Sequence, residues 1–262
     1  MSRLDAINTI IIDLDDTVWN WLESWYSVYA PGMEALADEL DCSFEQACAR
    51  VREAHRTAQS PEPLGLAYLL DSKLPSVDQL RRSMWSAQLA ALRTFEGVVS
   101  TLTQLKRKSY RIVACTESQY DLVRIRLFHT GLDKYLDHLS TKCTYDPRSD
   151  QWSFPNRTNF TPILPRMSKP NTDILWNLLE DLDKDPDQCL YVGDSLKRDI
   201  RMANDVGMPS VWANIKRPLP QGYELIDKLT HWTDEELQSR HDHEGQPQFI
   251  IHKFKELLEV VK

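Results

Sequence analysis

The stretch that decides the fold is residues 8–17, which read Asn8-Thr9-Ile10-Ile11-Ile12-Asp13-Leu14-Asp15-Asp16-Thr17. It begins with a continuous β-branched run, which is typical of a strand buried on both faces of a parallel sheet. Three acidic residues, Asp13, Asp15 and Asp16, follow where this run ends. Because parallel sheets bind ligands at the carboxyl ends of their strands, the stretch predicts a strand that delivers carboxylates into a site.

Similar apolar runs follow along the chain, at residues 110–116, 189–193, 209–213 and, more weakly, 249–251. Helical periodicity separates these runs, over residues 98–105, 174–182 and 200–206. Gly207 is placed to end the last of these helices. Alternating strands and helices predict an α/β fold with a doubly wound parallel sheet, covered by helices on both faces.

Between the first two predicted strands lies a long helical stretch, residues 19–93. Capping-box pairs, Ser43 with Gln46 and Ser76 with Gln79, mark the starts of two of its helices. We therefore expect a helical domain at 19–93 inserted into a core formed by 1–18 and 94–262. Two further segments look irregular: residues 141–167 suggest a hairpin, and 216–246 contain one short helix opened by Thr233.

The composition excludes several classes of function. The chain has 262 residues, a formal net charge of -8 and 42% hydrophobic residues, which argues for a folded protein and against nucleic-acid binding through a broad basic surface. No apolar run approaches the length that spans a bilayer, and the first residues lack a signal-peptide pattern. The five cysteines are odd in number and unpaired in spacing, which favours reduced thiols in the cytoplasm.

Other predicted strand ends also carry polar groups suited to chemistry. The second strand ends in Thr116-Glu117-Ser118, and the third in Gly193-Asp194-Ser195, with Asp199 beyond it. Lys169-Pro170 stands just before the helix that leads into the third strand. Since parallel strands end at one edge of the sheet, we expect these groups to converge although they are far apart in sequence.

These residues resemble the four motifs of the haloacid dehalogenase superfamily. Asp13-Leu14-Asp15-Asp16-Thr17 looks like its DxDx[TV] nucleophile motif, Thr116 its second motif and Lys169 its third. Gly193-Asp194 with Asp199 looks like the fourth. The match covers roughly residues 7–20 and 95–213, and the helical insert is similar to the α-helical cap of that superfamily.

The resemblance implies a role for each motif residue in the hydrolysis of a phosphate monoester. Asp13 is expected to attack phosphorus and form an aspartyl phosphate, and Asp15 to act as general acid and then base. Mg2+ takes hard oxygen ligands, here the Asp13 carboxylate, the Asp15 backbone carbonyl and the Asp194 carboxylate. Lys169 and Thr116 are expected to bind the phosphoryl oxygens.

Three further positions complete the expected site. Thr17 and Asp199 are expected to support it, Asp199 by assisting the metal site or orienting Lys169. Glu117 departs from the superfamily pattern, which often has a small or amide residue at this phosphate-binding position. Its side chain is expected either to turn away from the phosphate or to contact another part of the substrate.

The sequence thus predicts a magnesium-dependent phosphatase for a small phosphorylated metabolite, with neither nucleic acid nor membrane as partner. A dehalogenase is disfavoured because Asp15 supplies an acid/base that carbon–halogen cleavage does not use. Two alternatives stay open: a phosphomutase of the same superfamily, and a catalytically idle interaction protein. The sequence carries no signal for an oligomeric state.

Overall fold

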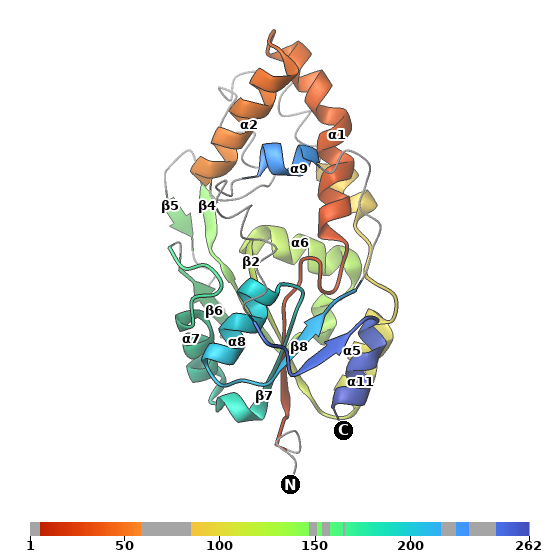
Figure 1. Ribbon diagram of the computed structural model, residues 1–262, viewed down its shortest axis with the longest axis vertical. Helices are drawn as coiled ribbons and strands as arrows, with labels where there is room; N and C mark the ends of the chain where they lie inside the picture. Colours follow the sequence, from red (N-terminus) through yellow and green to blue (C-terminus); the bar gives the residue numbers. More distant parts are fainter. Residues whose placement is uncertain are drawn as a thin grey trace.

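A computed structural model describes residues 6–58, 85–146, 151–153, 158–164, 166–215, 224–230 and 245–261. Within these residues, a parallel sheet of seven strands forms the centre of the lower half of Figure 1. In sheet order the strands are β6 (Phe160–Ile163), β3 (His138–Lys142), β2 (Arg111–Gln119), β1 (Thr9–Ile12), β7 (Cys189–Gly193), β8 (Ser210–Ala213) and β9 (Phe249–Ile251). The expected doubly wound α/β fold is confirmed.

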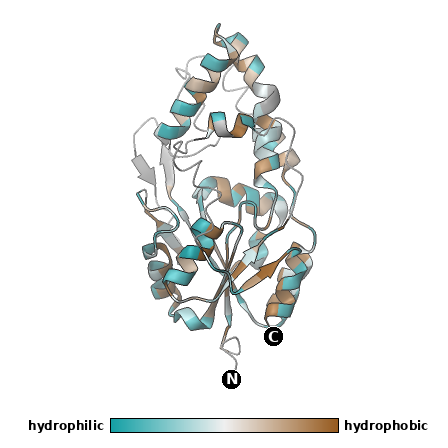
Figure 2. Ribbon diagram, in the orientation of Figure 1, coloured by the Kyte–Doolittle hydropathy of each residue, from teal (hydrophilic) through white to brown (hydrophobic). Residues whose placement is uncertain are grey.

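Helices cover both faces of the sheet, because alternate residues of each strand point to opposite faces. Ile10 and Ile12 pack in one cluster with α5 (Val98–Arg107), α6 (Tyr120–Thr130) and α11 (Leu257–Val260). Ile11 packs in a second cluster with α7 (Asp173–Leu182) and α8 (Arg201–Asp205). Figure 2 shows the apolar and polar stretches alternating along these helices, as expected for helices with one buried face. Both clusters place β1, and the carboxylates after it, at the centre of the molecule.

Short elements complete the core. The 3-10 helices are η2 (Asp133–Tyr135), η3 (Pro186–Gln188) and η6 (Phe254–Glu256), and η4 (Leu196–Ile200) is a π-helical turn that leads into α8. Gly207 adopts φ 75° after α8, as expected for the residue that ends a helix. A separate hairpin joins β4 (Thr144–Asp146) to β5 (Gln151–Ser153), so the hairpin expected within 141–167 is confirmed.

Two strands of the main sheet were missed in the sequence. β3 carries polar residues at four of its five positions, so it shows no apolar run, although all five positions are buried. β6 contains Pro162 and lies at the edge of the sheet, where a residue without an N–H is tolerated. The prediction that 141–167 is irregular apart from a hairpin was therefore wrong at residues 160–163.

The helical insert forms the upper half of Figure 1, with α1 (Trp21–Glu39) and α2 (Phe44–Ala58) leaning together. The Ser43 and Gln46 capping box is present: each side chain bonds the backbone N–H of the other residue, at 3.2 and 2.9 Å. Residues 85–91 are helical, whereas Ser76 and Gln79 lie outside the described residues. The two chain crossings between insert and core bond each other, Asn20 N–H to Arg93 O at 3.0 Å and Arg93 N–H to Asn20 Oδ1 at 2.6 Å.

A later segment joins the insert. α9 (Glu224–Leu229) packs its Ile226 and Leu229 against α1 and α2, although the expected division of the chain assigned it to the core. The buried His55 of α2 links the parts, since its Nδ1 lies 2.6 Å from Leu229 O and its Nε2 lies 2.9 Å from Tyr29 Oη. The helix expected at Thr233 lies outside the described residues.

All five cysteines are free thiols. Within the described parts of the chain, no helix has the length and apolar character that a membrane crossing requires.

Candidate active site

The first functional side chain, Asp13, stands one residue beyond the end of β1. Its N–H donates to Val192 O at 2.8 Å, so the ladder with β7 continues to this residue and fixes it at the carboxyl edge of the sheet. The chain then turns tightly: Thr17 N–H donates to Leu14 O at 3.2 Å, and Asp16 takes φ 61°. This turn returns the Thr17 hydroxyl to Asp13, where it donates to Oδ2 at 3.1 Å. The structure thus places Thr17 in contact with Asp13, and its supporting role stays a prediction.

Lys169 is the cation of the site and is almost fully buried. Its Nζ lies 2.5 Å from Asp13 Oδ1, 2.8 Å from Asp199 Oδ1 and 3.0 Å from Cys115 O, which accounts for all three ammonium donors. Burial alone would lower the pKa of Lys169, but the two carboxylates raise it well above its ordinary value. The lysine therefore stays charged. Burial raises the pKa of the Asp13 carboxyl to about 7, and the charge of Lys169 opposes this rise.

Asp199 is held from three directions. Besides Lys169, its Oδ1 accepts from Tyr191 Oη at 3.0 Å, and its Oδ2 accepts the Ser195 N–H at 3.1 Å. A Cβ at Gly193 would lie 2.5 Å from both Cβ and Cγ of Asp199, so the close approach of η4 to β7 needs glycine there. These contacts hold Asp199 against Lys169, the residue that the sequence predicts it to orient if it does not assist the metal site.

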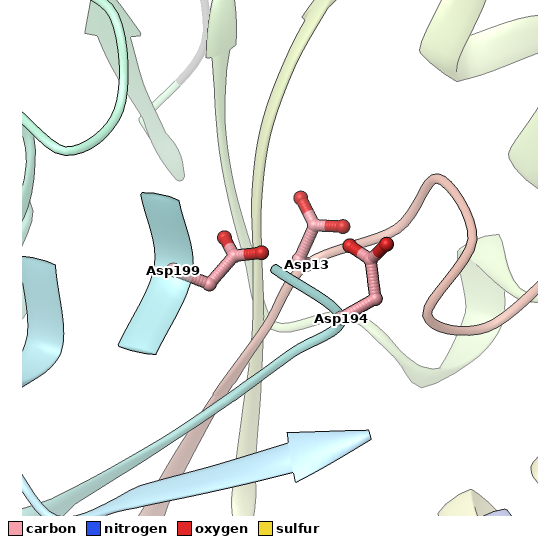
Figure 3. Close-up of side chains that lie close together, drawn as sticks. All are labelled: Asp13, Asp194 and Asp199. Atoms are coloured by element: carbon pink, nitrogen blue, oxygen red, sulfur yellow. The ribbon is translucent and has the colours of Figure 1, made fainter. Parts of the chain in front are cut away.

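Three carboxylates converge beside Lys169. Asp13, Asp194 and Asp199 each offer an oxygen, and these oxygens lie within 4.8 Å of one another (Figure 3). Hard oxygen donors of this kind suit Mg2+. Asp199 accepts from three donors, Lys169, Tyr191 and the Ser195 amide, whereas Asp13 accepts from two, Lys169 and Thr17, so Asp13 is the better placed ligand of these two. Asp194 is itself anchored, because its carbonyl accepts from Trp212 Nε1 at 2.8 Å.

Asp15 is fixed by donors on both of its carboxylate oxygens. Trp19 Nε1 donates to Oδ1 at 2.7 Å, and the Ser118 hydroxyl donates to Oδ2 at 2.5 Å. Arg126 places NH1 3.5 Å from Oδ1 and 3.2 Å from Ser118 Oγ. Trp19 lies at the crossing into the insert, where its backbone forms bridges with Asp15 and Thr94.

The end of β2 carries the remaining expected residues. Thr116 is buried, and its Oγ1 accepts the Ser118 N–H at 3.3 Å. The Glu117 carboxylate forms an ion pair with Arg198 and lies 3.9 Å from Lys142 Nζ. Because a carboxylate repels a phosphate, a phosphate contact at this position would have to come from the backbone of Glu117 and not from its side chain.

The structure thus brings together the motif residues that follow β1, β2, β6 and β7, as expected for strands that end at one edge of a parallel sheet. Sequence reasoning missed Arg126 and the paired cations of Glu117. A signal for Arg126 was present: α6 buries Leu122, Val123 and Leu127, so an arginine at position 126 falls on the apolar face. The contacts of Glu117 join residues 25 and 81 positions away, for which no local pattern exists.

Comparisons with known proteins find relatives that match along nearly the whole chain. A glyceraldehyde 3-phosphate phosphatase of Methanopyrus kandleri is 22% identical over 264 residues, which covers 98% of this chain and 97% of that protein. A HAD phosphatase from Thermococcus onnurineus has a similar structure, with a TM-score of 0.62 and 21% identity over 97% of both chains. A 2-haloacid dehalogenase from Pseudomonas syringae follows with a TM-score of 0.60 and 20% identity, again over 97% of both chains.

At these identities the structural likeness shows the fold alone, and the family comes from the sequence. The model of the haloacid dehalogenase-like hydrolases matches residues 7–207, most of the chain, and includes every motif residue described above. This protein is therefore a member of the haloacid dehalogenase-like hydrolase family.

Proposed function

We propose that the protein is a magnesium-dependent phosphatase that hydrolyses a small phosphomonoester through an aspartyl phosphate on Asp13. The observation that carries this proposal is the fixed pair of carboxylates two residues apart. Asp13 is buried against a charged lysine, and Asp15 is held by its own separate set of donors. Different surroundings for two nearby carboxylates suit a nucleophile and an acid/base.

The proposed reaction has two steps, and residues of this chain supply the nucleophile and the proton donor and acceptor for both. In the first, a carboxylate oxygen of Asp13 bonds to phosphorus, the ester P–O bond breaks, and Asp15 gives its proton to the leaving oxygen. In the second, Asp15 takes a proton from water, the water oxygen bonds to phosphorus, and the bond to Asp13 breaks. Free phosphate is released and Asp15 carries its proton again.

The phosphoryl oxygens need donors and positive charge throughout both steps. Lys169 supplies a compact positive charge next to Asp13. Thr116 Oγ1 accepts the Ser118 N–H, which leaves the hydroxyl proton to donate to a phosphoryl oxygen.

The residues present fit a divalent metal ion. Asp13 and Asp194 would hold it with their carboxylates, and the backbone carbonyl of Asp15 is the third expected ligand. When bound, such an ion neutralises the negative charge that a phosphate brings to a site that already contains several carboxylates.

Two relatives support the reaction class by name, the glyceraldehyde 3-phosphate phosphatase and the HAD phosphatase. The first also supports a small phosphorylated metabolite as the substrate. A helical insert above the site, as in Figure 1, favours substrates of that size. The free cysteines favour a reducing compartment, which for this protein we take to be the cytoplasm.

The test is a panel of phosphomonoesters assayed with Mg2+, with Ca2+ and with excess chelator. We expect activity with Mg2+ and poor activity with Ca2+, whose larger and looser coordination shell misplaces the nucleophile. Asp13→Asn should abolish turnover. Full activity in chelator, or no loss in Asp13→Asn, would overturn the proposal, and inactivity on the whole panel would favour the idle interaction protein.

The same panel separates a hydrolase from a phosphomutase. With the best substrate in 18O-labelled water, a hydrolase releases phosphate that contains one solvent oxygen, in step with the dephosphorylated product. Transfer of the phosphoryl group to a second sugar hydroxyl, with little free phosphate, would establish the mutase instead.

A further inference from the structure

The apolar face of α6 contains an arginine. Arg126 is 1% exposed and shares its face with Leu122, Val123 and Leu127. Removing a charged group from water costs several kcal/mol unless it is paired and hydrogen-bonded. The chain therefore needs a compensating partner for this guanidinium, and the partner is found at the proposed site of chemistry.

Arg126 reaches Asp15 both directly and through Ser118. Its NH1 lies 3.5 Å from Asp15 Oδ1 and 3.2 Å from Ser118 Oγ. A guanidinium can only donate, so Ser118 Oγ accepts from Arg126 and uses its single proton to donate to Asp15 Oδ2. The direction of this chain of hydrogen bonds is thus fixed by the residue types.

A hydroxyl between the cation and the carboxylate has a chemical advantage. In the proposed reaction the Asp15 carboxyl gives up a proton in the first step and takes one from water in the second. A serine hydroxyl can rotate to accept a hydrogen bond when the carboxyl carries the proton, and can donate when it does not. Ser118 can therefore keep its contact with Asp15 in both halves of the reaction.

We propose that Ser118 and Arg126 are positioning residues for Asp15: they hold its carboxyl group in the orientation for proton transfer, Ser118 by its hydrogen bond and Arg126 by its ion pair with Asp15 and its bond to Ser118. This inference rests on the proposed function, in which Asp15 is the general acid/base. It predicts that loss of either contact weakens proton transfer without removing the nucleophile, the phosphate donors or the metal ligands.

The first test is Ser118→Ala, compared on two substrates with Mg2+ present: the best alkyl phosphate of the panel and p-nitrophenyl phosphate. An alkoxide leaving group needs a proton and nitrophenolate does not. A hydrogen bond to a charged group corresponds to a factor of about ten to a hundred, so kcat for the alkyl ester should fall by that much. We expect less than about a threefold fall for the aryl ester. Ser100→Ala is the matched control, since Ser100 is exposed and its hydroxyl donates to the backbone carbonyl of Gly97, just before α5.

The second test asks whether Ser118 acts through Asp15. In an Asp15→Asn background, adding Ser118→Ala should change the alkyl-ester rate by no more than about twofold, because the group it positions is already gone. Arg126→Lys keeps the buried charge but loses the planar fork, and should show the same selective loss on the alkyl ester. Arg111→Lys is its control, at the opposite end of β2 with a bond to Leu182 O.

Equal losses on both esters in Ser118→Ala, or a further large loss in the Asp15→Asn background, would overturn the positioning role. These outcomes differ from failure of the proposed function. If Asp15→Asn itself lowers kcat for both esters equally, Asp15 is not the general acid. If Asp15→Asn is selective and Ser118→Ala is not, only the positioning role is lost. Urea unfolding of each variant distinguishes a folding defect from a lost positioning role, because a folding defect lowers stability without changing the ratio of the rates on the two esters.

Discussion

Replacing Gly193 by alanine tests the packing on which the candidate site depends. The added methyl group would lie 2.5 Å from Cβ and Cγ of Asp199 and 2.7 Å from its Oδ2. Real Cβ atoms do not approach that closely, so Asp199 and the π-helical turn η4 must move away from β7. Asp199 would then lose its geometry with Lys169, Tyr191 and the Ser195 amide, which now stand 2.8, 3.0 and 3.1 Å away.

The expected cost follows from these contacts. Overpacking a well-packed interior costs about 1–3 kcal/mol, and a hydrogen bond to a charged group contributes about 1.5–3 kcal/mol. Some of these bonds re-form after a shift, so the two effects together predict a loss of about 3 kcal/mol in the free energy of unfolding. For a chain of this size that lowers Tm by roughly 6–12 °C. Because the hydrogen bond to Asp199 orients Lys169, kcat should fall by about a hundredfold or more.

Urea unfolding and the phosphatase assay measure the two effects on one preparation. Gly207→Ala is the control, because a Cβ there meets nothing within 4 Å and only the positive φ of 75° opposes it. It should cost about 1 kcal/mol and leave kcat unchanged. If Gly193→Ala resembles this control in stability and in kcat, then the Asp199 contact does not hold the site together.

Two further predictions concern buried charge. Lys169→Met should abolish activity. In chelator it should also lower the free energy of unfolding by about 3–5 kcal/mol, because Asp13 and Asp199 lose the cation between them. Added Mg2+ should restore part of the stability and none of the activity, and unchanged stability in chelator would contradict this prediction. Burial lowers the pKa of His55 from 6.5 to about 4. As the pH falls, the unfolded chain therefore binds the proton at a higher pH than the folded chain does. The free energy of unfolding should accordingly fall by up to about 3 kcal/mol between pH 6.5 and pH 4. His55→Gln should flatten this part of the pH dependence in urea unfolding, and an unchanged slope would show that His55 is not its cause.

Much of the candidate active site could be predicted because its residues follow local patterns. An isoleucine run identifies β1, and its end fixes where Asp13 stands. β7 and β9 begin and end where their apolar runs do. Strands that end at one edge of a sheet must bring their following residues together, so the order of the motifs already implied the meeting of Asp13 and Asp194.

Other parts of the fold have no such pattern. β3 is buried although it is polar: β2 and β6 pair with it along both edges, and α6 packs against it. α9 packs against α1 and α2 although more than 160 residues separate it from them; one of the contacts is the hydrogen bond that His55 Nδ1 donates to Leu229 O. Burial of this kind depends on which surfaces meet after folding, which periodicity along the chain does not record.

The sequence by itself determined the α/β core, the helical insert and the identity of the motif residues, because hydrophobic period and strand-end position are local properties. Only the tertiary structure decided what each side chain faces. It placed Glu117 against Arg198 and Lys142, Tyr191 against Asp199, and Ser118 with Arg126 on Asp15. These contacts join separate strands and helices, and their energies depend on burial and distance, which exist only once the chain has folded.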